Sequence, residues 1–172
     1  FAAACEALAA HGSEEALEAL RARADRWEAF AALSGAAAAR DRPLFAEGLS
    51  RGAPWTAASA RALARAGEPE DGTLLLPFLE GEDQDAARAA AEAYARLGAP
   101  EGTEPLLRKA EELGLPPWML RCLGSLDSPS AHAFLFSRLA KPRKASFLKR
   151  LFKWGKAVEE DAGREAIAAA LS

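Results

Sequence analysis

The sequence has very little of what most small-protein architectures depend on. Its 172 residues include only two cysteines, Cys5 and Cys122, which are too few for a disulfide framework or a cysteine-based zinc site. β-branched residues are scarce and almost no stretch alternates apolar with polar residues, so we expect no β-sheet. No apolar run reaches the roughly 18 residues that a membrane crossing needs, so we expect no transmembrane helix.

The amino terminus also lacks the pattern of a signal peptide. The stretch "FAAACEALAAHG" has no basic leader and no long leucine-rich core. Together with the low cysteine content, this favours a reducing compartment, and we expect a cytoplasmic protein. The sequence begins with Phe1 and its only methionine is Met119, so we expect a fragment or a trimmed product of a longer protein.

Groups that could perform catalysis are few. His11 and His132 are the only histidines, and neither has the spacing of a nucleophile's base or a metal ligand. No glycine-rich phosphate loop occurs. Cys122 falls on an apolar stripe and is expected in the core. The acidic clusters "GEDQD" and "VEED" fall at expected helix starts, where they complement the helix dipole. We therefore predict a protein that is not an enzyme, with no catalytic residue, no metal and no cofactor.

Alanine and helical periodicity dominate what is present. Half of the residues are hydrophobic, and much of that share is alanine, a strong helix former. In "QDAARAAAEAYARLG" the apolar residues fall on one helical face, namely Ala90, Ala93, Tyr94 and Leu97. We expect Asp85 to be the N-cap of this helix, and Gly98 to follow its last turn in the left-handed conformation.

The same reading along the whole chain predicts twelve short helices. Gly35 either ends the third helix or only weakens it. The helices are expected near residues 2–11, 13–24, 26–39, 42–51, 54–66, 69–80, 84–97, 101–113, 116–125, 129–140, 143–155 and 158–171.

One turn sequence recurs along the chain. "GEPEDGTLLL" at Gly67 returns as "GAPEGTEPLL" at Gly98, 31 residues later, and more weakly as "LDSPSAHAFLF". When the second helices are aligned by the spacing between these turns, two columns of matching positions result. One is apolar (Leu63, Tyr94, Leu123 and Phe152) and the other is charged (Arg61, Glu92, Arg121 and Arg150). We therefore predict an all-α fold: one right-handed α-solenoid domain over residues 1–172, with about five helical hairpins and half units at the ends. The units are expected near 13–40, 41–67, 68–98, 99–127 and 128–156, with partial units at 1–12 and 157–172.

The stretch "DQDAARAAAEAYARLGAPEGTEPLL" resembles the HEAT-like repeats of bacterial proteins, including those related to phycobilin lyases. The positions that match are Asp83, Asp85, Ala87, Arg88, Ala90, Ala91, Leu97, Gly98 and Pro100. The resemblance is good over one repeat, partial over residues 41–156 and poor before Gly35; Ala87 replaces the usual valine. It implies the solenoid fold, which hosts many functions, and so carries no activity with it. A bilin-lyase-like enzyme is the weakest interpretation, because no catalytic group can be identified.

Positive charge is concentrated in one segment. Residues 128–158 contain eight basic residues and no acidic one, which leaves 14 basic against 25 acidic residues, a net charge of −11, for the remainder. The expected helix "KASFLKRLFKWGK" is basic and amphipathic. Either this segment binds an anionic partner, or its charge is solvated and balances the acidic repeats. The basic residues are Arg138, Lys141, Arg143, Lys144, Lys149, Arg150, Lys153 and Lys156.

The solenoid predicts a non-enzymatic scaffold that presents a concave surface of second helices to a protein partner with an acidic segment. The alternative is a nucleic-acid or anionic-ligand binder that uses residues 138–156. The expected partner-binding residues project opposite the core stripes: Arg61, Arg65, Arg88, Glu92, Arg96, Arg121, Arg150, Lys153 and Trp154.

HEAT-like DNA glycosylases, which use tryptophan around a damaged base, are a poor match. Those enzymes are basic, whereas this chain has a net charge of −3. Its tryptophans show no common repeat position and are expected in the core: Trp27, Trp55, Trp118 and Trp154. Nucleic acid is therefore the less expected partner, and a protein partner is preferred.

Overall fold

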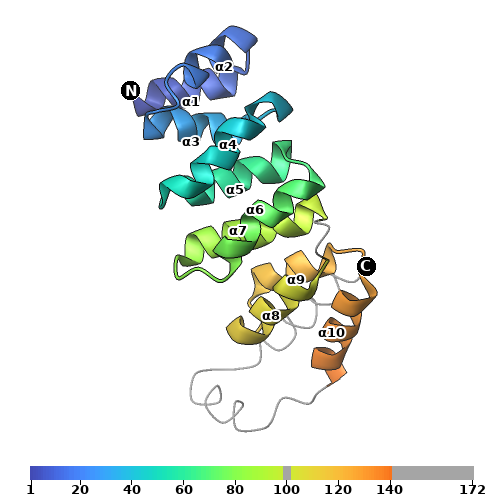
Figure 1. The fold of residues 1–172 in the computed structure, drawn as a ribbon. Helices are drawn as coiled ribbons and strands as arrows, with labels where there is room; N and C mark the ends of the chain where they lie inside the picture. The colour runs from blue at the N-terminus through green and yellow to red at the C-terminus, as the bar shows by residue number, and fades with distance from the viewer. Residues whose placement is uncertain (99–101, 141–172) are drawn as a thin grey trace, which may run out of the picture. The chain divides into compact units, whose positions relative to one another are not determined.

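The computed structural model describes residues 1–98 and 102–140, and every regular element in these ranges is helical (Figure 1). The predicted all-α class is therefore confirmed for this part of the chain. The α-helices are α1 (Ala2–His11), α2 (Glu14–Arg21), α3 (Trp27–Gly35), α4 (Arg42–Gly48), α5 (Trp55–Ala66), α6 (Gly72–Leu79), α7 (Gln84–Leu97), α8 (Glu104–Leu113), α9 (Pro117–Gly124) and α10 (Pro129–Ala140). Short 3₁₀ helices are η1 (Ala39–Asp41), η2 (Leu49–Arg51) and η3 (Pro69–Asp71).

The predicted helix bounds agree with α1–α10 to within four residues at every end. The largest difference is in α3, which ends at Gly35 and not near residue 39. Gly35 therefore ends this helix and does not merely weaken it. The helices predicted near 143–155 and 158–171 lie outside the described residues.

Two compact units make up the chain: unit 1 (residues 1–102) and unit 2 (residues 103–172). In unit 1, α1 contacts α3, α3 contacts α5, and α5 contacts α7. α2 packs on α1 and α3, α4 packs on α5, and α6 packs on α7 (Figure 1). Unit 1 thus contains helical hairpins whose second helices α3, α5 and α7 contact one another in chain order. In unit 2, α9 contacts both α8 and α10.

The ends of α7 show which part of the capping prediction holds. Gly98 follows the last turn with φ 62° and ψ 49°, the left-handed conformation that was predicted. The predicted N-cap is wrong: Asp83, not Asp85, caps the helix, because α7 begins at Gln84. One carboxylate oxygen of Asp83 accepts hydrogen bonds from the backbone N–H groups of Asp85 and Ala86, at 3.0 and 3.1 Å.

The aligned apolar column forms part of the core. Leu63, Tyr94 and Leu123 are completely buried, and Phe152 lies outside the described residues. The hydroxyl of Tyr94 donates a hydrogen bond to the carbonyl oxygen of Gly102, at 3.0 Å. Cys122 is buried, as the apolar stripe predicted. The predicted helix phase is therefore correct for α5, α7 and α9.

Hairpin α4–α5 depends on a close approach at Gly48. A Cβ atom at this position would lie 2.6 Å from Cζ of Phe30 and would also overlap the hydroxyl of Ser59. Real Cβ atoms essentially never approach other heavy atoms so closely. The absent side chain at Gly48 thus lets α4 pack against both Phe30 and α5.

Two buried aspartates connect the first helices of successive hairpins, which are α2, α4 and α6. Asp41 is only 2 % exposed; its carboxylate accepts hydrogen bonds from Nε of Arg21 on α2, at 2.6 Å, and from the backbone N–H of Ala38, at 3.0 Å. Asp71 is 3 % exposed and repeats this arrangement. Nε of Arg42 on α4 lies 2.8 and 3.0 Å from the two carboxylate oxygens of Asp71.

The pKa of Asp41 is below its ordinary value. Burial is the largest single influence and raises the pKa, because it disfavours the charged carboxylate. The hydrogen bonds from Arg21 and Ala38, and the positive charges of Arg21 and Arg40, together outweigh burial. The folded protein therefore binds the proton of Asp41 more weakly than the unfolded chain does.

We predict that Gly48→Ala lowers the free energy of unfolding by about 1–3 kcal/mol, because the new methyl group must displace Phe30 or Ser59. Urea denaturation followed by circular dichroism measures the change. Gly35→Ala is the matched control, since a Cβ there would meet nothing within 4 Å. Equal losses in the two variants would contradict the close-approach interpretation.

A second prediction concerns Asp41→Asn. This substitution should lower the free energy of unfolding by about 1–3 kcal/mol at neutral pH, because it removes a charged hydrogen-bond acceptor. The pKa of Asp41 is lowered on folding, so this stabilisation is complete above the ordinary aspartate pKa of about 3.9 and is lost as the pH falls through the folded-state pKa. The difference between the wild type and the variant should therefore shrink below about pH 4 in urea titrations. The exposed Asp25, changed to Asn, should show no comparable difference.

Candidate partner-binding surface

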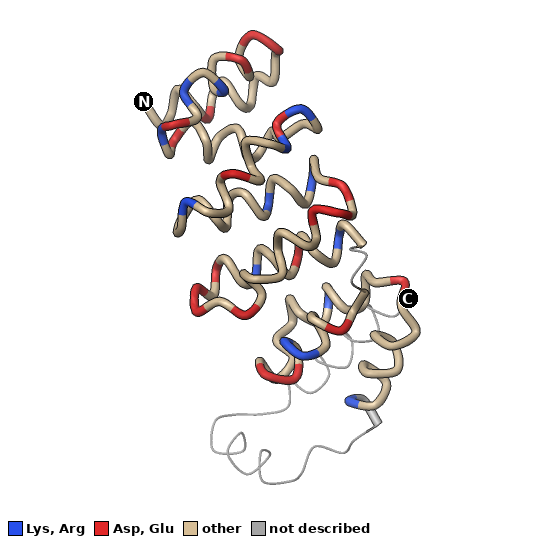
Figure 2. Tube along the Cα trace, viewed as in Figure 1, with Lys and Arg blue, Asp and Glu red and all other residues tan. Residues whose placement is uncertain are grey.

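The predicted partner-binding residues of unit 1 form two rows on adjacent second helices. Arg61 and Arg65 lie on α5; Arg88, Glu92 and Arg96 lie on α7. A spacing of four residues places each row on one helical face. The arginines are exposed and Glu92 is half-buried, whereas Leu63 and Tyr94 are completely buried. The rows therefore occupy the sides of α5 and α7 that their packing partners leave uncovered. Figure 2 shows these helices carrying blue segments while red is prominent in the nearby loops.

The arginines of these rows differ in their partners. Arg88 donates from Nε to a carboxylate oxygen of Glu92, at 3.0 Å, across one helical turn. Within the described part of the chain, neither Arg61 nor Arg96 forms an ion pair. Asp85 is also exposed on this side of α7, so four arginines face two acids, a surplus of two positive charges. This surface can attract carboxylates or other anions.

Arg65 also has a structural role. Its Nη1 donates to the backbone carbonyl oxygens of Gly35, at 2.8 Å, and Ser34, at 3.3 Å. These carbonyls belong to the last turn of α3, where a cation complements the negative end of the helix dipole. The guanidinium of Arg65 therefore links α3 to α5, although the residue as a whole is exposed.

Unit 2 contains two of the predicted residues among those described. Arg121 on α9 is exposed, as the charged column predicted. Nη2 of Arg138 on α10 donates to a carboxylate oxygen of Glu111, at 3.0 Å, and its guanidinium lies 5.1 Å from the ring centre of Phe134. Arg138 is thus partly neutralised within unit 2. The other predicted residues lie outside the described ranges: Lys141, Arg143, Lys144, Lys149, Arg150, Lys153, Trp154 and Lys156.

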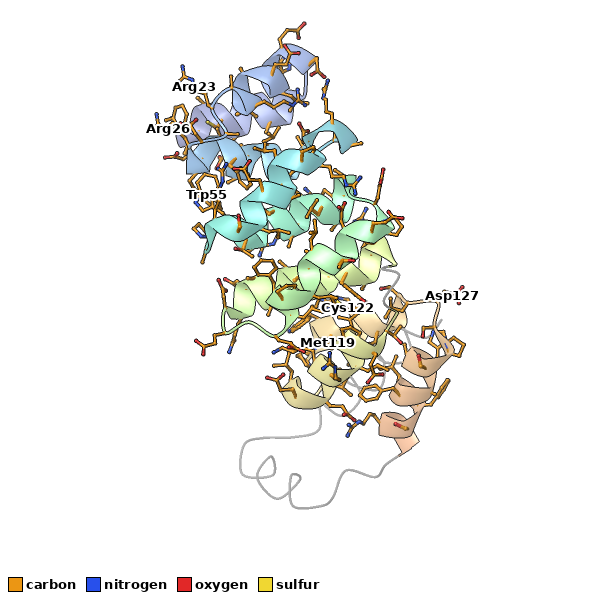
Figure 3. All side chains as sticks on the ribbon, in the orientation of Figure 1. Arg23, Arg26, Trp55, Met119, Cys122 and Asp127 are labelled. Atoms are coloured by element: carbon orange, nitrogen blue, oxygen red, sulfur yellow. The ribbon has the colours of Figure 1, made fainter. Side chains whose placement is uncertain are left out.

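Sequence reasoning missed a cluster of aromatic and arginine side chains at one edge of unit 1. Figure 3 labels Arg23, Arg26 and Trp55 along this edge. The rings of Trp27 and Trp55 meet edge to face with their centres 5.5 Å apart. The guanidinium of Arg51 lies 5.1 Å from the ring centre of Trp55, within cation–π range.

The expectation that the tryptophans share no repeat position is wrong for Trp27 and Trp55 but holds for Trp118. Trp27 and Trp55 are the first residues of α3 and α5, and Trp118 is the second residue of α9. None of the three is fully buried, so the expectation that they lie in the core is not met; Trp27 is 36 % exposed. A signal was available for Trp27 and Trp55, since each is the second residue of its expected helix.

Other chemistry has little support in the described residues. They hold no group of three or more His, Cys, Asp or Glu side chains arranged to bind a metal ion. His11 is the last residue of α1 and is exposed, as expected for a histidine that closes a helix. Over the same ranges, none of the helices combines the length and the apolar character needed to cross a membrane.

Comparison with family models, curated proteins and solved structures found no match to this chain. The candidate surface is therefore interpreted from its own geometry and charge.

Proposed function

We propose that the chain is a cytoplasmic bacterial α-solenoid of HEAT-like hairpins. The order of contacts in unit 1 supports this architecture, because each second helix contacts the second helix of the next hairpin. The spacing of 31 residues between matching positions of α5 and α7 supports it as well. Such a fold exposes one face of every second helix, and this is where the arginine rows lie.

We infer that this face binds a protein partner through an acidic segment, without catalysis. The observation that carries the inference is the surplus of arginine on α5 and α7. Residues 1–102 contain 10 arginines, no lysine and 17 acidic residues, a net charge of −7, yet the uncovered sides of α5 and α7 carry four arginines against Asp85 and Glu92, a net charge of +2. Guanidinium groups bind carboxylates in a bidentate geometry, which provides orientation as well as attraction.

A long polyanion fits this surface less well than a short acidic segment does. The 17 acidic residues of unit 1 would repel a phosphate backbone that extended beyond the arginine rows. A peptide with a few carboxylates can engage the arginines without approaching those acids. The protein partner is therefore the preferred candidate.

Binding of nucleic acid or another anionic ligand through residues 138–156 is the second candidate. The eight basic residues between 128 and 158, uninterrupted by any acid, favour it. Of these eight, the structure describes only Arg138, which is paired with Glu111.

The solenoid predicts an elongated particle. Small-angle scattering of a dilute sample should give a radius of gyration above the roughly 15–16 Å of a compact globule of this length. Circular dichroism should show helix without a strand signal. A radius of gyration as small as that of a compact globule would contradict the solenoid.

The binding proposal predicts that Arg61→Glu with Arg96→Glu weakens binding of a labelled poly-glutamate peptide by about tenfold or more, measured by fluorescence anisotropy. Arg23→Glu with Arg26→Glu is the matched control, because it changes the net charge equally on another edge of unit 1. Capture of the native partner from cell extract should likewise be weakened by Arg61→Glu with Arg96→Glu and unchanged by the control variant.

The same titration with a random DNA duplex discriminates between the candidates. We expect weak binding with a small dependence on salt, since few phosphates can be neutralised. Tight, steeply salt-dependent DNA binding that is lost in Lys149→Glu with Lys153→Glu would favour the second candidate and overturn the first.

A further inference from the structure

Acidic residues surround α6 on both sides. From Gly67 to Ala87 the sequence contains seven acidic residues and no lysine or arginine. Those that precede α6 are Glu68, Glu70 and Asp71, and those that follow it are Glu80, Glu82, Asp83 and Asp85. No other part of the described chain combines such a charge block with so apolar a helix.

The outward side of α6 is apolar. Its sequence, "GTLLLPFL", has hydrophobic residues all round the helix, a composition typical of helices that are covered on every side. Only one side is fully covered: Leu75 and Leu79 are buried, whereas Leu74 is 44 % exposed and Pro77 is exposed. An apolar strip therefore remains open to solvent.

The acids that precede and follow α6 in the sequence differ in whether they form ion pairs. Glu68 and Asp71 pair with Arg42, the first at 2.7 Å and the second at 2.8 Å. Glu70 and Glu82, at the two ends of α6, are exposed and form no ion pair with any described residue. We call Leu74, Pro77, Glu70 and Glu82 the α6 face. Its chemistry fits a segment with apolar anchors between basic residues.

The same chain contains a segment of that composition. Residues 144–156, which lie outside the described ranges, hold five basic residues and no acid. Their apolar residues are Phe147, Leu148, Leu151, Phe152 and Trp154. We propose that the α6 face binds residues 144–156 of a second copy of this chain, so that the protein self-associates head to tail.

Two observations favour a second copy over other occupants. The acidic block and the basic block are opposite in sign and both contain large apolar residues, so one chain carries both halves of the match. Nucleic acid and anionic membranes would be repelled by Glu70 and Glu82. Because the two patches differ, such an interface is heterologous and can extend beyond a dimer. The inference is independent of the proposed function, which uses α5 and α7.

Sedimentation velocity of the full chain over a concentration series tests the proposal. At low salt we expect the average mass to rise above that of one chain as the concentration increases. Near-physiological salt should weaken this association, because screening reduces attraction between exposed charges. A single-chain mass at every concentration and both salt levels would overturn the proposal, whether the α6 face is left free or takes a foreign partner.

A charge-exchange experiment identifies the two patches. Glu70→Lys with Glu82→Lys should abolish self-association, and so should Lys149→Glu with Lys153→Glu, while circular dichroism confirms that both proteins are folded. Mixing the two variants pairs the intact α6 face of one with the intact segment of the other, so association should return. Two folded variants that remain monomeric when mixed would contradict a direct contact between the patches.

The apolar anchor has its own matched control. Leu74→Asp should weaken self-association by about tenfold or more, because it places a charge in the apolar strip. Leu113 on α8 is similarly exposed, at 41 %, and Leu113→Asp should leave the association unchanged. Equal effects would overturn the assignment to α6. Arg61→Glu with Arg96→Glu should leave self-association intact, so failure of the proposed function can be told from failure here.

Discussion

The shallow contact between alanine-rich helices is the constraint on which the rest of unit 1 depends. The core faces of α5 and α7 consist mainly of alanine, and a buried alanine removes little apolar surface from water. Helices with such faces must approach closely to gain packing energy, so a position such as Gly48 has no room for a methyl group. A few large anchors, among them Phe30, Leu63 and Tyr94, supply the remaining apolar burial.

Because each apolar contact contributes little to the stability of unit 1, the hydrogen bonds and ion pairs of the buried aspartates are important for holding one hairpin on the next. Asp41 and Asp71 each satisfy a backbone N–H of their own turn and a guanidinium from the preceding first helix, so they fix where one hairpin lies on the next. The residue 31 positions after Asp71, the same offset that aligns α5 with α7, is Gly102. Gly102 has no carboxylate, and unit 1 ends at this residue. The carboxylate that makes the ionic contact in the two preceding turns is therefore missing from the corresponding sequence position.

Periodicity and turn residues were enough to predict the helices, the class and the core columns, because these features depend on local sequence. Leu63, Tyr94 and Leu123 followed from a constant offset between helices. Side-chain reach is not local: the sequence did not indicate that Arg21 would contact Asp41, 20 residues away, or that an acidic turn would be buried. For the candidate surface, helix phase correctly predicted that Arg61 and Arg96 are exposed. It could not predict that Arg65 would bind carbonyl groups of α3.

The separation of charges on unit 1 follows from where each kind of residue can be placed in a helical hairpin. Carboxylates satisfy backbone N–H groups at helix starts and turns, so the acids gather in the connections, as Asp83 and Asp71 do. Arginine is a good helix former and tolerates mid-helix positions, so Arg61 and Arg96 lie on α5 and α7, away from those acids. The result is a basic helix surface with acidic loops at its margins. The proposed acidic partner segment is accordingly short, because a longer one would reach the acidic loops and be repelled.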